Sequence, residues 1–433
     1  MRLNGRARQH IVSAAAAGYA PAMTRVAVIG GGAAGMMAAA FAAPGGAETL
    51  LLEHTPDGGR KILISGGGRC NILPAHLDET RFVTDSSPHT LRNILRSWPL
   101  AEQRAFFEHV LGQPLVEEIA SAKLFPASQR ARDVRDGLLA HAVARGAQWM
   151  PSTTVSGLVR AGDGWRIACR DGRMLDADRV IVASGGLSVP KTGSDGGGLA
   201  LLAALGHTIH EPYAALTPVT AEPVPFAGLA GVSLTVSLVA RDAERSASAR
   251  GGFLFTHRGY SGPAVLDVSH VLVRSGRAAR LIAQWAALDV DGWERTLRSD
   301  GARSVAGVVR GEMPARLADL LVRRAGVDPD SRLSQLRRAD RVRLVEGLAR
   351  CELPWTGHGG YAKAEVTGGG VSLAEIDPRT MESRKHPGLF LCGEVLDAFG
   401  PIGGYNFLWA WATGRAAGLG AAREHCTTRR SMR

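Results

Sequence analysis

The sequence is informative first for what it has little of. Its five cysteines are scattered without any C-x-x-C pair, a usage typical of cytoplasmic proteins that argues against a disulfide framework and a zinc site. No apolar run approaches the roughly 18 residues that would span a membrane. Neither a metal-ligand cluster nor a serine triad stands out among the polar residues. We therefore expect a cytoplasmic protein without a metal, a disulfide or a membrane segment.

Lysine is also scarce, since only five of the 51 basic residues are lysines. The formal charge is +11, but residues 1–22 and 423–433 carry +3 each, which leaves only +5 for the rest of the chain. Such an arginine and alanine bias is typical of base-composition effects on codon use, and most of these arginines are expected on a solvated surface. A nucleic-acid partner is therefore left open rather than indicated.

Residues 1–22 are basic and rich in alanine, and they lack the long apolar core of a secretory signal. A mitochondrial transit peptide has a similar composition. We expect a disordered extension here, with Met23, immediately before the first predicted strand, as the true start. The whole chain of 433 residues is 45% hydrophobic, which is enough for two or three domains with proper cores.

The chain is organised around residues 26–35, VAVIGGGAAG, an apolar run that opens into glycines spaced as G-x-G-x-x-G. This spacing is typical of the first strand, turn and helix of a dinucleotide-binding fold. Gly30 would form the tight turn, Gly32 would let the backbone approach a pyrophosphate, and Gly35 would let the helix pack closely on the strand. The phosphates would then lie at the positive end of that helix.

A helix and a second strand follow in the order that this fold requires. Residues 36–41 are good helix formers, and the apolar run 49–52 ends in Glu53. An acid at this place accepts hydrogen bonds from the adenosine ribose hydroxyls, and a carboxylate there argues against a ribose 2′-phosphate. The sequence therefore predicts a dinucleotide site, which at this point could hold NAD or FAD.

A second glycine-dense loop lies within residues 58–71, GGRKILISGGGRCN. Its glycines would let backbone N–H groups crowd around an anionic or planar ligand, and Arg60, Lys61 and Arg69 could neutralise a phosphate. The alternative is an ordinary mobile surface loop. Further on, residues 148–155 are predicted as a strand near the adenine, and the buried strand 179–183 returns the chain to the cofactor.

The pattern changes between residues 206 and 354, which predicts an inserted domain. Its first part alternates at period two, as in residues 231–240, and its second part, 312–352, is helical and carries an arginine face. That face is expected in solvent, with contact to substrate or RNA as the alternative. No second G-x-G-x-x-G follows a strand here, so a dedicated nicotinamide domain is absent and NAD(P)H would dock transiently.

The chain also resembles a known family. The stretches that carry the resemblance are VAVIGGGAAG, GGRKILISGGGRCN, LFPASQRARDVRDGLL, VIVASGGLSVPKTGSDGGGLALLAALGH, FLFTHRGYSGPAVL, AKAEVTGGGVSLAEIDPRTMESR and GLFLCGEVLDAFGPIGGYNFLWAWATGRAAG. They resemble the YhiN-like (BaiN/RdsA-type) family of NAD(P)/FAD-dependent flavoproteins, from Met23 to about Gly420. Two departures are small: Ser184 stands where threonine is usual, and Cys392 where alanine is common.

The resemblance implies an α/β architecture in two parts. A discontinuous Rossmann-type FAD-binding domain is expected over residues 23–205 and 355–425. The insert 206–354, first β-rich and then helical, would form a substrate or cap domain. The helix that follows residues 403–406 would direct its positive end at the N1/O2 edge of the flavin.

The family motifs also imply which residues hold the cofactor. Glu394 stands where the flavoprotein motif has an acid that bonds the ribityl chain or the pyrophosphate. The residues expected to bind FAD are Gly30, Gly32, Ala33, Ala34, Gly35, Glu53, Lys61, Ser65, Gly66, Gly67, Arg69, Cys70, Asn71, Val155, Ser184, Gly185, Gly393, Glu394, Gly403, Gly404, Tyr405 and Asn406.

Catalytic candidates lie in the insert, which is expected to cover the flavin face. They are His257, Arg258 and Tyr260. His257 titrates near neutrality, and Arg258 could hold an anionic or carbonyl-bearing substrate. A histidine with a purely structural role is the alternative for His257.

The function implied by the resemblance is an FAD-dependent oxidoreductase that reduces an activated C=C bond with NAD(P)H. The substrate would be a small enone, or uracil in ribosomal RNA that is converted to dihydrouridine. Two alternatives stay open: an FAD-dependent amine oxidase of the aminoacetone type, and a flavin-holding RNA-binding protein without turnover. The sequence carries no signal of oligomeric state.

Overall fold

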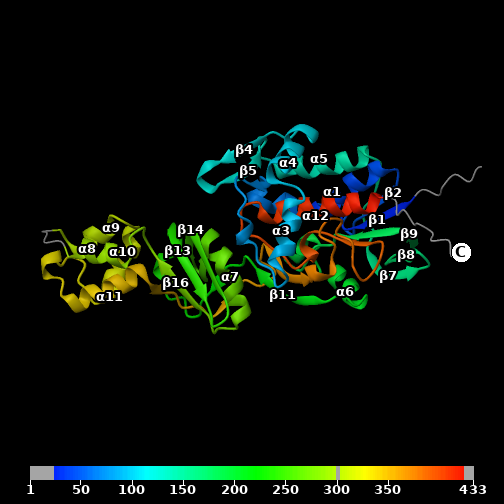
Figure 1. Ribbon diagram of the computed structural model, residues 1–433. Coiled ribbons are helices and arrows are strands. Elements are labelled where there is room, and N and C mark those ends of the chain that lie inside the picture. Colours follow the sequence, from blue (N-terminus) through cyan, green and yellow to red (C-terminus); the bar gives the residue numbers. More distant parts are fainter. Residues whose placement is uncertain (1–23, 299–302, 424–433) are drawn as a thin grey trace, which may run out of the picture.

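A five-stranded parallel sheet lies at the centre of the larger part of the molecule (Figure 1). The computed structural model describes residues 24–298 and 303–423, so the predicted extension 1–22 lies outside the described residues. The strand order is β20-β10-β1-β2-β6, and every neighbouring pair is parallel. The strands are β1 (Arg25–Ile29), β2 (Glu48–Leu52), β6 (Ala147–Met150), β10 (Arg179–Val182) and β20 (Leu389–Leu391).

These strands form where the sequence has continuous apolar runs. In β1 all residues from Val26 to Ile29 are buried, as expected for a strand covered on both faces of a parallel sheet. In register, Val26 lies between Arg179 of β10 and Thr49 of β2. The predicted Rossmann-type α/β fold, with strands at residues 26–29, 49–52, 179–182 and 389–391, is confirmed.

The single strand predicted over residues 148–155 is wrong, because the chain breaks there into two strands. β6 ends at Met150, and β7 (Val155–Ala161) belongs to a separate antiparallel sheet with β8 (Gly164–Cys169) and β9 (Met174–Ala177). Pro151 has no N–H to donate to a neighbouring strand, and Ser152 adopts a left-handed φ of +54°. The chain therefore leaves the central sheet before it reaches Val155.

Helix α1 (Ala33–Ala42) and the C-terminal helix α12 (Tyr405–Ala422) lie side by side in backbone contact (Figure 1). A Cβ atom added to Gly414 would lie 2.4 Å from the carbonyl oxygen of Ala34, and one added to Gly418 would lie 2.3 Å from that of Ala38. The two glycines are four residues apart and therefore share one face of α12. Their missing side chains set how closely the two helices approach.

Shorter elements complete the larger part. A small antiparallel sheet has the order β3-β5-β4. The remaining elements are α2 (Arg60–Ile64), β3 (Leu73–Pro74), α3 (Pro88–Arg96), α4 (Leu100–Ala105), β4 (Leu115–Glu118), β5 (Lys123–Pro126), α5 (Ala131–Ala144) and α6 (Gly197–Ala204).

The insert begins and ends at two paired strands, β11 (Ile209–Ala215) and β19 (Val366–Val371). Beyond them is a seven-stranded antiparallel sheet of the order β17-β16-β13-β14-β15-β12-β18. Its strands are β12 (Val219–Thr220), β13 (Ser233–Arg241), β14 (Ser246–Thr256), β15 (Gly259–Ser261), β16 (Arg280–Gln284), β17 (Cys351–Glu352) and β18 (Gly357–His358). Helix α7 (Pro263–Ser275) packs against this sheet and against β11.

The helical part of the insert lies farthest from the parallel sheet (Figure 1). It comprises α8 (Val290–Leu297), α9 (Val305–Arg310), α10 (Ala315–Arg324) and α11 (Arg338–Ala349). It begins before residue 312, where the sequence predicted its start. The prediction missed α8 and α9 because these two helices are short. A second hydrophobic core, separate from that of the parallel sheet, contains buried residues from Val219 to Leu353. The boundaries 206 and 354 themselves stay a prediction.

Two kinds of site can be checked against the described residues. None of the described helices is both long and apolar enough to cross a bilayer. Within the same residues, no three histidine, cysteine, aspartate or glutamate side chains come together as metal ligands could.

The contact between α1 and α12 leads to a stability prediction. Replacing Gly414 by alanine should lower the free energy of unfolding by about 1–3 kcal/mol, because the new methyl group overlaps a backbone carbonyl that cannot move freely. Urea unfolding followed by circular dichroism measures the change. Gly347→Ala in α11 is the control, because nothing lies within 4 Å of its added Cβ. Equal stability of the two variants would contradict the proposed role of the contact.

Candidate functional site

One large cavity opens at the carboxyl ends of β1 and β2, the edge where ligands bind in open α/β sheets. Its volume of about 550 Å³ is within the roughly 300–1,000 Å³ of cofactor and ligand sites. Most of the residues expected to bind FAD line it, namely Gly30, Gly32, Ala33, Ala34, Glu53, Lys61, Ser65, Gly66, Gly67, Asn71, Val155, Ser184, Gly185, Gly393, Glu394, Gly403, Gly404 and Asn406. Four others, Gly35, Arg69, Cys70 and Tyr405, lie outside its lining.

In the first glycine turn, Gly30 has a structural role, whereas Gly32 leaves open space. Gly30 has a φ of +107°, and a Cβ there would lie 2.5 Å from the carbonyl oxygen of Ala183. No atom lies within 4 Å of a Cβ added to Gly32, so a side chain there would extend into the cavity. Gly35 packs instead of lining the cavity, since its Cβ would lie 1.8 Å from the carbonyl oxygen of Gly30. The N-terminal turn of α1 therefore faces the open space beside Gly32.

Glu53 is buried at the end of β2 and is held by backbone donors. Its Oε2 accepts a hydrogen bond from Gly31 N–H at 2.7 Å, and its Oε1 accepts one from Thr55 N–H at 2.7 Å. Each carboxylate oxygen has a second lone pair. The side chain therefore has the orientation and the free acceptor capacity that a ribose hydroxyl requires.

The second glycine loop lies against the same cavity through Ser65, Gly66 and Gly67. Gly66 and Gly67 have φ values of +55° and +68°, a region that favours glycine. Arg69 points elsewhere: it donates to Glu118 at 2.9 Å and stacks over the ring of Phe125. The loop therefore contributes backbone groups to the cavity rather than this arginine.

Cys70 is fully buried behind the loop, and burial raises the pKa of its thiol to about 12. The thiol is therefore neutral at physiological pH and packs as an apolar group. The sequence could not show this burial, because the two neighbours of Cys70 in the chain do not share it: Arg69 pairs with Glu118, and Asn71 lines the cavity.

Lys61 and Glu394 form an ion pair in the cavity wall. Lys61 Nζ lies 2.5 Å from Glu394 Oε2 and donates to Ser188 Oγ at 2.6 Å. Glu394 Oε1 accepts from Ser188 Oγ at 2.7 Å and from Thr367 N–H at 2.9 Å. Burial alone would raise the pKa of Glu394, but the charge of Lys61 and these donors hold that pKa below its ordinary value. The pair therefore presents a fixed, compensated charge.

The N-terminus of α12 forms another wall. Gly403 and Gly404 have φ values of +110° and +93°, and both line the cavity. Asn406 anchors the turn, since its side chain donates to and accepts from the backbone of Gly400 at 2.9 Å. Tyr405 turns away, and its hydroxyl donates to the carbonyl oxygen of His76 at 3.2 Å. The positive end of a second helix thus points at the cavity.

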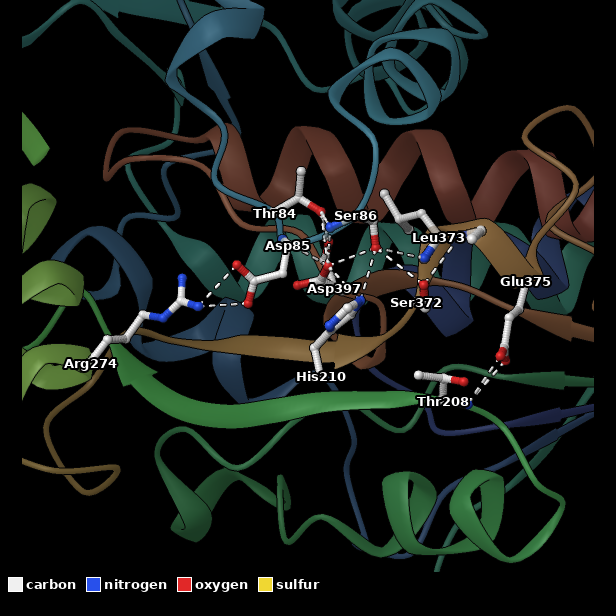
Figure 2. A network of polar contacts seen from close by, with 11 residues as sticks. Thr84, Asp85, Ser86, Thr208, His210, Arg274, Ser372, Leu373, Glu375 and Asp397 are labelled. Carbon is white, nitrogen blue, oxygen red and sulfur yellow. Dashed lines mark hydrogen bonds and ion pairs between the residues drawn. The ribbon is translucent and has the colours of Figure 1, made fainter. Parts of the chain in front are cut away.

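A polar network fixes the chain just before that turn (Figure 2). Asp397 is 2% exposed, and its Oδ2 accepts four hydrogen bonds of 2.8–2.9 Å from residues 84–86. His210 Nε2 lies 3.6 Å from the same oxygen. In a serine–histidine–acid relay the acid contacts only the histidine, whereas Asp397 contacts both Ser86 and His210, so this group is not such a relay. The network instead holds the chain next to Phe399, which lines the cavity.

Two buried polar atoms test whether FAD fits. Within the described part of the chain, Asn71 Oδ1 and Ser184 Oγ are buried at the cavity without a hydrogen-bond partner. A buried polar group without a partner costs free energy, so a ligand that bonds it is favoured. The open space at Gly32, the two helix N-termini and the Glu53 acceptor match the phosphates and ribose of a dinucleotide. The residues present therefore fit FAD.

The three catalytic candidates of the insert are not brought to this cavity. His257 and Arg258 are exposed in the turn between β14 and β15. Tyr260 is 1% exposed in the aromatic core of the insert, where its hydroxyl donates to the carbonyl oxygen of Pro354 at 3.0 Å. No local sequence pattern indicates which way this turn faces, and the catalytic role of the three residues stays a prediction.

Other residues line the cavity that sequence reasoning missed, among them Thr153, Arg170, Asp195, Glu365, Phe399 and Ile402. Glu365 directly precedes β19 and lies within one of the stretches that carry the family resemblance. Thr153 lies at the break after Met150, Phe399 and Ile402 lie before α12, and Asp195 lies in the loop before α6. No local pattern reveals the course of these segments.

The glycine turn yields a prediction about cofactor retention. Gly32→Val should give a folded protein that purifies without bound flavin. The valine side chain would overlap no protein atom, but it would fill the part of the cavity where we expect the pyrophosphate. Absorbance of the purified protein in the flavin bands measures this. Gly228→Val in the insert, also with nothing within 4 Å of its Cβ, should stay yellow. A yellow Gly32→Val protein would contradict the placement of the pyrophosphate.

Comparison with known proteins gives relatives over most of the chain. A 3-dehydro-bile acid delta(4,6)-reductase of Clostridium scindens is 31% identical over 382 residues, which cover 86% of this chain and 92% of that protein. A ribosomal RNA dihydrouridine synthase of Escherichia coli is 31% identical over 371 residues, 82% of this chain and 87% of that one. The resemblance seen in the sequence is thereby confirmed, as is the expectation of an FAD-dependent oxidoreductase.

Solved structures are more distant. A flavocytochrome c3 fumarate reductase in its open conformation has a TM-score of 0.49 and 18% identity, and the match covers 93% of this chain and 78% of that chain.

The model of one protein family, described as the HI0933-like protein Rossmann domain, matches residues 24–420. This match spans both segments of the parallel-sheet part together with the insert between them. The chain therefore belongs to the HI0933-like Rossmann-domain family.

Proposed function

We propose that this protein is an FAD-dependent reductase of a C=C bond conjugated to a carbonyl group, with NAD(P)H as the source of electrons. The names of the two relatives support it, since a delta(4,6)-reductase of a 3-dehydro-bile acid and a dihydrouridine synthase both saturate such a bond. When bound, reduced FAD supplies the hydride that adds to the β-carbon of the substrate. The reaction then needs one proton at the α-carbon.

The observation that carries the proposal is one cavity whose walls contain the N-termini of α1 and α12 and whose lining includes the carboxylates of Glu53 and Glu394. The α1 end and Glu53 suit the phosphates and ribose. The α12 end, with Phe399, Ile402 and Gly403, leaves an apolar wall for a flat substrate beside the reactive ring. With FAD bound, the positive end of α12 would stabilise negative charge on the reduced ring, which would favour reduction of the flavin by NAD(P)H.

The source of the hydride follows from the domain content. No second G-x-G-x-x-G follows a strand in the sequence. NAD(P)H therefore docks transiently over the flavin and leaves before the substrate binds. We place the protein in the cytoplasm, because its described cysteines are unpaired and buried.

Charge bears on which substrate class is used. Residues 290–350 contain 13 arginines and nine acidic residues, so this segment carries most of the excess positive charge of the body. Several of these arginines are paired with nearby acids, as Arg310 of α9 is with Asp319 of α10 and Arg337 with Asp340. The remaining excess would favour an RNA substrate over a neutral one, and it would do so less at high salt.

Anaerobic half-reactions test the proposal. NADPH or NADH should bleach the bound flavin, and an enone such as a 4-ene-3-ketosteroid, or uracil-containing RNA, should restore its colour with formation of the saturated product. Stopped-flow absorbance measures both steps. Bleaching by amines but not by NAD(P)H would indicate an amine oxidase instead, and a flavin that neither reduces would indicate a binding protein without turnover.

The two substrate classes are separated by the second step. For RNA, reoxidation should slow steeply as salt rises, and dihydrouridine should disappear from ribosomal RNA of a strain that lacks the gene. For an enone, salt should have little effect and the ribosomal RNA should be unchanged.

A further inference from the structure

Four carboxylates line the cavity in the described part of the chain: Glu53, Asp195, Glu365 and Glu394. Glu53 and Asp195 accept hydrogen bonds from backbone N–H groups at 2.7–2.9 Å, and Glu394 is paired with Lys61. Among the described residues, no donor contacts the carboxylate of Glu365. It is therefore the cavity carboxylate whose charge the protein leaves without a direct partner.

The backbone of Glu365 is held at the cavity wall. Its N–H donates to the carbonyl oxygen of Leu216 at 3.1 Å, and its own carbonyl oxygen accepts from Ser188 Oγ at 3.3 Å. The residue lies directly before β19, where the chain returns from the insert. Its side chain is accessible from the cavity, so a bound substrate can reach the carboxyl group.

Two charged groups act on Glu365 from other elements. Lys123 of β5 runs past the α12 turn, with its Cε 3.5 Å from the position of a Cβ on Gly403. Asp267 of α7 accepts from Ile402 N–H at 2.9 Å and pairs with Arg81 at 3.2 Å. Both therefore contact the segment of Ile402 and Gly403, which lines the cavity, without lining the cavity themselves.

Their charges explain how Glu365 can hold a proton. Glu365 is open to the cavity, but the protein around its carboxyl group still removes water from it, and this desolvation raises its pKa. The charge of Lys123 lowers the pKa in part, and the negative charge of Asp267 raises it further. Burial also raises the pKa of Asp267, to about 6, against the effects of Ile402 N–H and Arg81. Two carboxyl groups thus share one lysine, and the arrangement favours a neutral acid at one of them.

We propose that Glu365 is the proton donor of the reductase and that its carboxylic acid protonates the α-carbon of the substrate. This inference rests on the proposed function. Once the hydride has added to the β-carbon and the C=C π bond has broken, the electron pair lies over the α-carbon and the carbonyl oxygen. The O–H bond of Glu365 then breaks as a C–H bond forms at the α-carbon.

This step leaves the substrate saturated, Glu365 as a carboxylate and the flavin oxidised. Water returns the proton to Glu365, and NAD(P)H returns two electrons and a hydrogen to the flavin. Lys123 and Asp267 act as positioning residues, since they set the protonation state of Glu365 without contact to the substrate.

Glu365→Gln tests the inference directly. The variant should keep its flavin and its rate of bleaching by NAD(P)H, whereas reoxidation by an enone should slow by about 10²–10⁴-fold, the usual contribution of a general acid. Glu365→Asp, which keeps an acid at a shorter reach, should recover part of that rate. Glu211→Gln, at an exposed acid of β11, is the control and should behave as the wild type.

Three further readouts separate a proton donor from a structural residue. In D₂O the wild type should place deuterium on one face of the α-carbon, and Glu365→Gln should place it on both. The wild-type reoxidation rate should fall as pH rises past the raised pKa of Glu365, since the acid form is required, and the variant should lack this dependence. Infrared difference spectra without substrate should show a protonated carboxyl band in the wild type that Glu365→Gln lacks.

The neighbouring charges should shift the pH dependence in opposite directions. Lys123→Met removes a charge that lowers the pKa of Glu365, so activity should extend to higher pH. Asp267→Asn removes a charge that raises the pKa, so activity should be lost at lower pH. A wild type that no conjugated C=C compound reoxidises overturns the proposed function and the donor role with it. A reoxidisable wild type whose Glu365→Gln variant keeps its rate and facial selectivity overturns the donor role alone.

Discussion

The arrangement of this protein depends on the position of α1, which is held by backbone contacts on two sides. On one side Gly35 approaches the carbonyl oxygen of Gly30, and on the other Gly414 and Gly418 of α12 approach the carbonyl oxygens of Ala34 and Ala38. Side chains are absent at every one of these points, so none can change rotamer to relax the contact. The N-terminus of α1 is therefore fixed relative to the sheet that forms the floor of the cavity.

The same helix pair connects the two ends of the cofactor site. α12 packs along α1 and also begins at the opposite wall of the cavity, at Gly403 and Gly404. A displacement of α12 would move the wall at Gly403 and Gly404, where we expect the flavin ring, whereas a displacement of α1 would move the turn at Gly32, where we expect the phosphates. The close packing of the two helices therefore keeps these two walls of the cavity in a constant relation to each other.

Charge inside the cavity follows a consistent division. Glu53 accepts hydrogen bonds from backbone N–H groups and Glu394 is paired with Lys61, which suits groups that bind and orient. Glu365 differs, since the surrounding protein raises its pKa and no donor among residues 24–298 and 303–423 contacts its carboxylate. Donating a proton and binding a ribose are different tasks. A carboxylate that stays ionised cannot donate a proton, and a neutral acid that no hydrogen bond orients would bind a ribose hydroxyl poorly. The two tasks therefore need different surroundings, and the fold provides them in one cavity.

Much of this could be read from the sequence, for a physical reason. The glycine turns, the buried strands and Glu53 are local features, because a positive φ, a two-sided buried strand or a strand-terminal acid depends on a few neighbouring residues. The break at Pro151 was also local, since a proline argues against a central strand, yet the predicted strand ran through it. The orientation of the turn carrying His257 depends instead on how the insert sheet packs. Glu365 was missed because the charges that act on it, Lys123 and Asp267, come from elements more than 90 residues away in the chain.

The pairing of β11 with β19 has a consequence for how such a protein can diversify. Ala215 lies opposite Val366, so the chain leaves the parallel-sheet part and returns to it at neighbouring positions. A segment joined through adjacent ends adds little closure entropy to the part that carries it, whatever its length. The insert can therefore be lengthened, shortened or exchanged between relatives while the cofactor site stays the same. The joint itself ends at Glu365, so any exchanged insert meets the reaction chemistry at a residue that the flavin-binding part already supplies.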